Sequence, residues 1–171
     1  NYFAGLRTAY DALELAESYS IDGSMLADLE IDVGNIYMRL EQYEKTDSLL
    51  SFILIQRKEH LSPSQIADIH NNQGLCSFNL GNAESAKLHF KEAEVYYKQA
   101  DNKKRLSKVY NNLASFYTEL QIDENKAIDY YKKAIAIKLQ YADSSGLSYS
   151  YYNIASLFYN IGVSDSALHY G

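Results

Sequence analysis

Several residue types that define common classes of protein are scarce in this chain. Its 171 residues include no tryptophan, one cysteine, one proline and eight glycines. A single cysteine excludes an intrachain disulfide, and no Asn-x-Ser/Thr sequence offers an N-glycosylation site. No apolar run approaches the roughly 20 residues of a transmembrane helix, so we expect no membrane insertion by this segment. These absences leave the compartment open; we favour the cytoplasm, with an exported or periplasmic sensor segment as the alternative.

A basic surface is lacking as well. The chain carries 22 acidic and 16 basic side chains, a net charge of −6, and residues 1–60 hold 11 of the acidic ones. The basic cluster in segment 103–108 follows a turn at 101–102, where solvated charge at a helix start explains it. We expect no contact with nucleic acid, because such contact requires a clustered basic face.

Signatures of catalysis and metal binding are also missing. The four histidines, at positions 60, 70, 89 and 169, do not pair at the spacing of metal ligands on a helix. Cys76 lies on a predicted helix, where we expect it to pack, and no phosphate-binding or dinucleotide motif occurs. The sequence predicts no catalytic residue, no cofactor and no metal, and therefore no enzyme. A catalytic or carbohydrate-handling domain is an alternative that requires a pocket of convergent carboxylates and aromatic rings.

What the chain does contain is an internal repeat. Apolar residues recur at helical steps of three and four, which predicts an all-α chain. Four small residues occupy the same place in a local pattern, at separations of 40, 40 and 41 residues: Gly34, Gly74, Ala114 and Ala155. Periods of this length are typical of stacked helix pairs, which bind partners more often than they catalyse reactions.

Two copies of the first-helix pattern are especially clear, each with an aromatic, a large apolar, a small and a second aromatic residue: Tyr110, Leu113, Ala114, Tyr117 and Tyr151, Ile154, Ala155, Phe158. On these residues the chain resembles the tetratricopeptide repeat family, in a long-period form similar to kinesin light chains and to bacterial sensor and regulator arrays. The resemblance implies a right-handed α-α superhelix of antiparallel helix pairs. The missing tryptophan, the missing closing proline and the period near 40 depart from the usual 34-residue pattern.

We predict one solenoid fragment over residues 1–171, which we interpret as part of a longer array or of a multidomain protein. Its predicted parts are a second helix of a truncated repeat, three repeats and a further truncated repeat: 1–19, 24–60, 62–100, 103–141 and 144–171.

Local signals place the helix ends. Ser62 and Gln65 form a predicted capping box around Pro63, and Asp123 is a predicted cap with one inserted residue near 121–125. Three predicted breaks separate helices: Gly81-Asn82, Asp101-Asn102 and Ser144-Ser145-Gly146.

The resemblance also implies where a partner would bind, because first helices of the family line a concave groove. Positions two before the small residue hold Asp32, Asn72, Asn112 and Asn153, and positions one after it hold Asn35, Leu75, Ser115 and Ser156. An asparagine amide both donates and accepts, so a ladder of them can hold the main chain of an extended peptide. Alternatively, these amides bond to neighbouring helices or to water, and the adjacent Asn71 and Asn111 extend the groove or face solvent.

Basic and aromatic residues at the predicted groove also bear on the kind of partner. Lys108 is the basic residue placed to enter the groove, and no cationic clamp for a terminal carboxylate occurs at the corresponding sites: Ile31, Asn71, Asn111 and Tyr152. Tyr149, Tyr152 and Tyr159 project from the last first helix, and tyrosine is enriched at binding hot spots. These rings alternatively pack against further sequence, and stacking on a sugar is a third explanation.

The sequence therefore predicts a non-catalytic scaffold that binds a protein or peptide segment in its groove. The alternative function is a sensor or regulatory segment of a larger bacterial signalling protein, such as a sensor kinase or a transcriptional regulator. The oligomeric state stays open.

The helix contacts predict the effect of enlarging a small residue. Ala93→Leu and Ala114→Leu should each lower the free energy of unfolding by roughly 1 to 3 kcal/mol, because the larger side chain forces paired helices apart. Thermal unfolding measures this effect, and neutral behaviour of both variants would show that the helix contacts are assigned incorrectly.

Overall fold

A computed structural model describes residues 2–19 and 21–170. The predicted boundaries at positions 1 and 171 lie outside the described residues. The chain forms two compact units, Asn1–Ala100 and Asp101–Gly171. No strand occurs among the described residues, so the all-α prediction is confirmed. None of the helices in these ranges is both long and apolar enough to cross a membrane.

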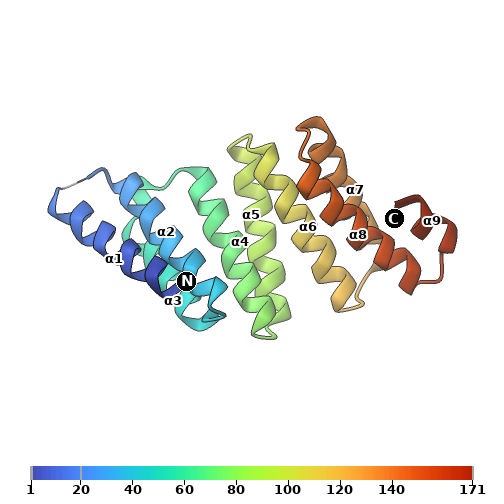
Figure 1. Ribbon diagram of the computed structural model, residues 1–171, viewed down its shortest axis with the longest axis horizontal. Helices are drawn as coiled ribbons and strands as arrows, with labels where there is room; N and C mark the ends of the chain where they lie inside the picture. Colours follow the sequence, from blue (N-terminus) through green and yellow to red (C-terminus); the bar gives the residue numbers. More distant parts are fainter. Residues whose placement is uncertain (1, 20, 171) are drawn as a thin grey trace. The chain divides into compact units, whose positions relative to one another are not determined.

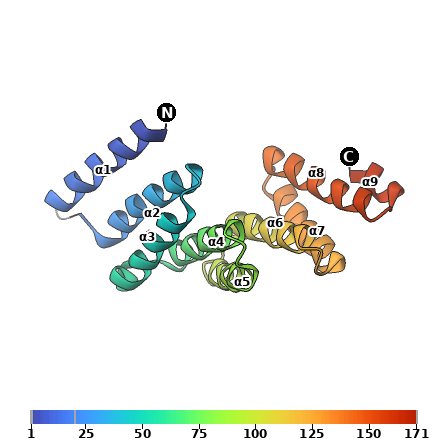
Figure 2. The ribbon, with the colours of Figure 1, turned by 90° about the horizontal axis from the view of Figure 1, so that it is seen from below.

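The described residues of the first unit form five α-helices and one 3₁₀ turn (Figure 1). They are α1 (Tyr2–Ser18), α2 (Gly23–Arg39), α3 (Tyr43–Gln56), η1 (Lys58–His60), α4 (Pro63–Asn79) and α5 (Ala83–Gln99). The helices pack as neighbours in chain order, and α4 also reaches α2. Figure 2 shows α2 between α1 and α3.

The second unit contains four described helices: α6 (Lys103–Glu119), α7 (Glu124–Gln140), α8 (Ser144–Asn160) and α9 (Ser164–Tyr170). α6 pairs with α7, and α8 packs against both of them. The short helix α9 packs back onto α8.

The turns inside the helix pairs share one backbone feature. One residue in each has a positive φ: Glu41 (58°), Gly81 (80°), Gln121 (52°) and Gly162 (78°). Glycine adopts this conformation without a steric penalty, whereas Glu41 and Gln121 adopt it because the turn is short. The turn before α7 has four residues, 120–123, where the other three have three, which confirms the inserted residue.

The predicted helix starts are largely correct. Ser62 and Gln65 form the capping box with Pro63 at the first helical position, and Asp123 accepts a hydrogen bond from the Lys126 amide at 3.0 Å. The predicted break at 144–146 is wrong, because α8 already begins at Ser144. Asp143 accepts from the Gly146 amide at 3.0 Å and thereby starts the helix earlier.

Close packing of paired helices centres on the small residues of the repeat. Phe90 is buried directly over Gly74, where an added Cβ would lie 2.6 Å from the ring carbon Cδ1. At the equivalent Gly34 the opposing atom is Leu50 Cδ2, at 3.3 Å from such a Cβ. The predicted contact between first and second helices is therefore confirmed, and it is closer at Gly74 than at Gly34.

These two glycines predict opposite results for one chemical change. Alanine in a helix interior gains up to about 1 kcal/mol over glycine. Gly34→Ala should be neutral or slightly stabilising, because the end of the Leu50 side chain can shift. Gly74→Ala should lower the free energy of unfolding by roughly 1 to 3 kcal/mol, because the Phe90 ring is fixed in the core and cannot shift away from the added methyl group. Urea unfolding of both variants tests the pair, and equal effects would contradict the packing described.

Candidate partner-binding site

In the first unit, the predicted groove residues are hydrogen-bonded to one another. Asn72 Nδ2 on α4 donates to Asn35 Oδ1 on α2 at 2.8 Å, and Asn35 Nδ2 donates to Asp32 Oδ1 at 3.3 Å. Asn72 is only 8% exposed, so this bond is largely shielded from water. Here the asparagine amide joins two first helices. This agrees with the alternative interpretation, in which these amides bond to neighbouring helices instead of to a peptide.

The exposed part of this surface lies on α2. Asp32, Asn35 and Arg39 border a cavity of about 580 Å³ together with Ile36 and Met38. Leu75 on α4 is half-buried. A partner that enters this cavity would meet one carboxylate, one guanidinium and the edge of the asparagine pair.

In the second unit, α6 supplies three of the predicted residues. Lys108 is exposed, and Asn112 and Ser115 are partly exposed. Ser115 Oγ lies 3.2 Å from the hydroxyl oxygen of Tyr131 on α7, in hydrogen-bonding distance. Burial raises the pKa of Tyr131, so this hydroxyl stays protonated and can act as the donor.

Helix α8 presents three exposed aromatic candidate residues. Tyr152 and Tyr159 are 71% and 76% exposed, and Tyr149 is also exposed. Asn153 and Ser156 are partly exposed. Within the described ranges the Asn153 carboxamide makes no hydrogen bond, so its donors and acceptor are available to a ligand.

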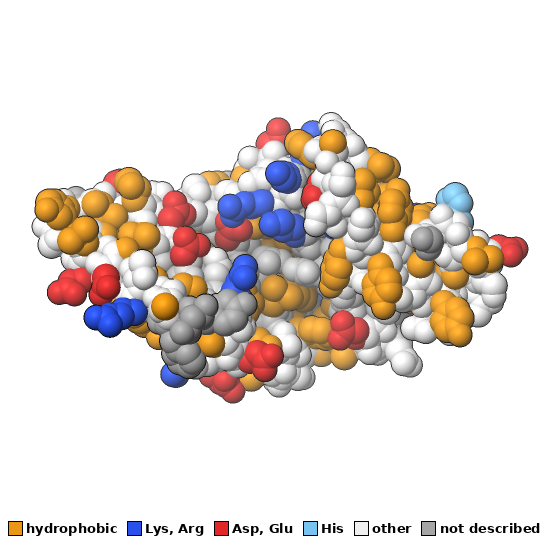
Figure 3. All heavy atoms as spheres, viewed as in Figure 1, with side chains coloured by type: hydrophobic (Ala, Val, Ile, Leu, Met, Phe, Trp, Pro, Cys, Tyr) orange, Lys and Arg blue, Asp and Glu red, His pale blue; other side chains and the backbone are white. Residues whose placement is uncertain are grey.

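Tyr152, Ser156 and Tyr159 also line a cavity of about 780 Å³, whose other wall includes Ala167 and Leu168 of α9. Hydrophobic side chains gather over α8 and α9 in Figure 3. None of the described residues that line this cavity is charged. It therefore lacks the convergent carboxylates that the catalytic alternative requires.

Two of the positions considered for a carboxylate clamp are buried and do not line a groove. Ile31 is buried in the apolar core between α2, α3 and α4. Asn111 is only 4% exposed and accepts a hydrogen bond from Ser150 Oγ of α8 at 2.8 Å. Adjacent helices cover both residues, and therefore neither of them lines a groove.

A buried lysine accompanies Asn111. Lys138 of α7, 4% exposed, donates to Ser150 Oγ at 2.6 Å and to the Gly146 carbonyl oxygen at 3.0 Å. Burial lowers the pKa of this ammonium group, and nearby Asp143 opposes that effect. The network Lys138, Ser150 and Asn111 fixes α8 against α6 and α7, and so positions the residues that α8 exposes.

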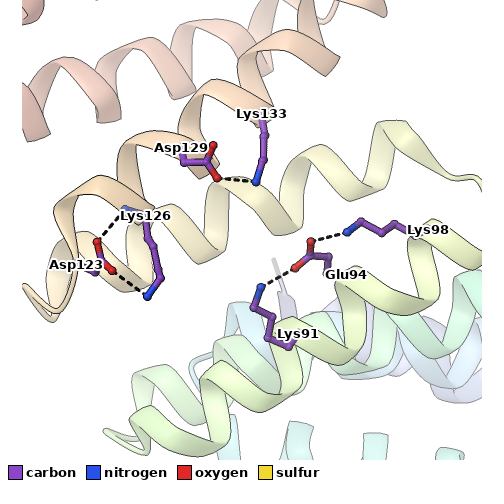
Figure 4. A network of polar contacts seen from close by, with 7 residues as sticks. All are labelled: Lys91, Glu94, Lys98, Asp123, Lys126, Asp129 and Lys133. Carbon is purple, nitrogen blue, oxygen red and sulfur yellow. Dashed lines mark hydrogen bonds and ion pairs between the residues drawn. The ribbon is translucent and has the colours of Figure 1, made fainter.

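Several charged side chains of the second helices α5 and α7 form local ion pairs (Figure 4). In the first unit Glu94 of α5 bridges Lys91 and Lys98 at 2.9 and 2.8 Å. In the second unit, α7 has the pairs Asp123–Lys126 and Asp129–Lys133. Such pairs contribute little to stability when exposed, and they are typical of a solvated surface.

Sequence reasoning missed a contact between two histidines. His70 of α4 and His89 of α5 approach with their Nδ1 atoms 3.1 Å apart, although they are 19 residues apart in the chain. Their spacing carries no motif, because only the packing of α4 on α5 joins them. No group of three or more potential metal ligands is assembled within the described ranges.

The lone cysteine fulfils the packing prediction. Cys76 is fully buried, and burial raises the pKa of its thiol to about 12. The thiol is therefore protonated near neutral pH, whereas a nucleophile needs the thiolate.

Comparisons with known proteins agree with this architecture. Residues 107–141 match the tetratricopeptide repeat family model. A search of curated proteins by sequence gives no match. Among solved structures, BtubC (BKLC) from P. vanneervenii is 22% identical with a TM-score of 0.82, over 99% of this chain and 70% of its own.

Two further structures are informative. The Rap conjugation gene regulator of the plasmid pLS20, solved in complex with the Phr* peptide, is 18% identical with a TM-score of 0.83, over 99% of this chain and 47% of its own. The repeats of a putative kinesin light chain from Podospora anserina are 13% identical with a TM-score of 0.71, over 99% and 82%. At these identities the likeness establishes the fold. The chain thus has a tetratricopeptide-like repeat fold, and the resemblance found in its sequence is confirmed.

The buried network in the second unit predicts that removal of the Ser150 hydroxyl strongly lowers stability. Ser150→Ala should lower the free energy of unfolding by about 1 to 3 kcal/mol, because Lys138 loses an acceptor and Asn111 loses a donor. Ser148→Ala is the matched control, since its exposed hydroxyl bonds only to its own helix, at Ser144 O. Urea unfolding compares them, and equal losses would contradict the role given to the network.

Proposed function

We propose that this chain is a non-catalytic scaffold that binds an extended peptide or partner segment along its first helices. The observation that carries the proposal is the surface of α8, where the Asn153 carboxamide, without a hydrogen-bond partner among the described residues, lies among exposed tyrosines. An amide can donate to and accept from a peptide main chain, and tyrosine rings add contact area at low entropic cost.

The other candidate residues take part unequally. Lys108, Asn112 and Ser115 offer accessible polar groups on α6. Asn72 is buried against Asn35, so its contribution is to hold α2 and α4 in register for Asp32 and Leu75. The peptide complex of the Rap regulator, which has a similar fold, supports a peptide as the class of partner.

A sensor or regulatory segment of a larger bacterial signalling protein is the second candidate function. It is favoured by the similarity of fold to a gene regulator that binds a peptide. The two candidates share a binding surface and differ in what binding does. An output domain encoded in the same reading frame would support the regulatory role.

Binding should depend on the accessible asparagines. Each hydrogen bond lost on substitution by alanine removes about 0.5 to 1.5 kcal/mol, so Asn112→Ala/Asn153→Ala should weaken partner binding roughly tenfold or more. The measurement is capture from a lysate of the source cell with immobilised chain, followed by titration of each retained protein.

Two controls make this test specific. Asn125→Ala applies the same change to an exposed position of the second helix α7 and should leave binding unchanged. Asn72→Ala should lower stability as well as binding, because it breaks the contact with Asn35. Unchanged affinity in the Asn112→Ala/Asn153→Ala variant would overturn the proposed surface.

A further inference from the structure

The His70–His89 contact in the first unit is a hydrogen bond that depends on protonation. Its Nδ1 atoms are 3.1 Å apart, the ring centroids 5.4 Å apart and the ring planes inclined by only 27°. The two nitrogens therefore face each other across nearly parallel rings. One nitrogen must carry the proton and the other must offer its lone pair, because two lone pairs or two N–H groups repel at this distance.

Next to the histidine pair, a buried glutamine links α4 to α3. Gln73, one turn from His70 on α4 and only 3% exposed, donates through Nε2 to Asp47 Oδ1 at 3.2 Å and to Ser51 Oγ at 3.0 Å. Both acceptors belong to α3. The buried Gln73 Oε1 has no hydrogen-bond donor among the described residues, and the carboxamide favours the protonated form of His70.

We propose that His70 and His89 form a proton-sensitive link between α4 and α5, which holds while at most one of the two imidazoles is protonated. When both rings carry two protons, two N–H groups and two positive charges face each other in a partly buried site. The contact then breaks, and α4 loses one of its attachments to α5. The inference does not depend on the proposed function.

The surroundings of the pair determine the direction of the pH dependence. Burial lowers the pKa of both histidines, and the positive charge of His89 lowers that of His70 further. Glu92 on α5 favours the protonated form of both rings, and Asp47 on α3 favours that of His89, but these carboxylates do not reverse the effect of burial. The folded state therefore binds fewer protons than the unfolded chain, and stability falls as the pH drops below about 6.5.

Histidine NMR on the wild-type chain tests the link directly. At pH 7.5 we expect opposite tautomers, with Nδ1 protonated in one ring of the pair and unprotonated in the other. During acidification the pair should take up its protons in two separate steps, the second well below the ordinary histidine range. Two rings that are both protonated at Nε2, or that titrate independently near pH 6.5, would overturn the proposal. This readout requires no variant to fold.

Unfolding measures the consequence. If the folded pair excludes one proton, acidification from pH 7.5 to 5.5 should raise the unfolding equilibrium constant of the wild type. This rise should be about tenfold larger than the rise in the His70→Asn/His89→Asn double variant. Urea unfolding, followed by the NMR signals of the first unit, gives both values. His169→Asn is the matched control in the second unit and should behave as the wild type. An equal pH dependence in the wild type and the double variant would contradict the link.

Discussion

The close approach of paired helices at one small residue is the constraint on which the repeat depends. At Gly74 the ring of Phe90 occupies the space that a side chain would need. At the equivalent Ala114 the methyl group is fully buried. The small residue sets the distance between the helices, and that distance decides which other side chains can meet. At this separation His70 meets His89, and Ser115 meets Tyr131.

Polar contacts then specify how neighbouring pairs are arranged. Apolar surfaces can slide, whereas a buried hydrogen bond forms only in one register and is costly to leave unmade. In the first unit this role falls to Asn72 and Asn35. In the second unit it falls to Asn111, Ser150 and Lys138. Groups that look like a binding ladder in the sequence are therefore partly structural.

The sequence predicts the helices well because periodicity, caps and turns are local properties. The capping box at Ser62 and the inserted residue near Gln121 follow from residue types at fixed spacing. Side-chain destinations are less predictable, since a lysine or asparagine on a helix reads as solvent-exposed whatever packs over it. The burial of Lys138 and Asn111 depends on α8. The predicted break at 144–146 is wrong because Ser-Ser-Gly resembles a turn, whereas Asp143 caps α8 and these three residues are already helical.

The two units differ in their balance of acidic and basic side chains, and this difference bears on the class of partner. The first unit carries 15 acidic and 8 basic side chains, whereas the second carries 7 and 8. On α8 the candidate residues are exposed tyrosines with a partly exposed serine and asparagine, none of them charged. Uncharged amides and hydroxyls recognise a main chain, which every peptide shares, and aromatic rings add affinity without demanding one sequence. For any partner that contacts the first unit, its excess of acidic side chains would favour basic segments and disfavour acidic ones.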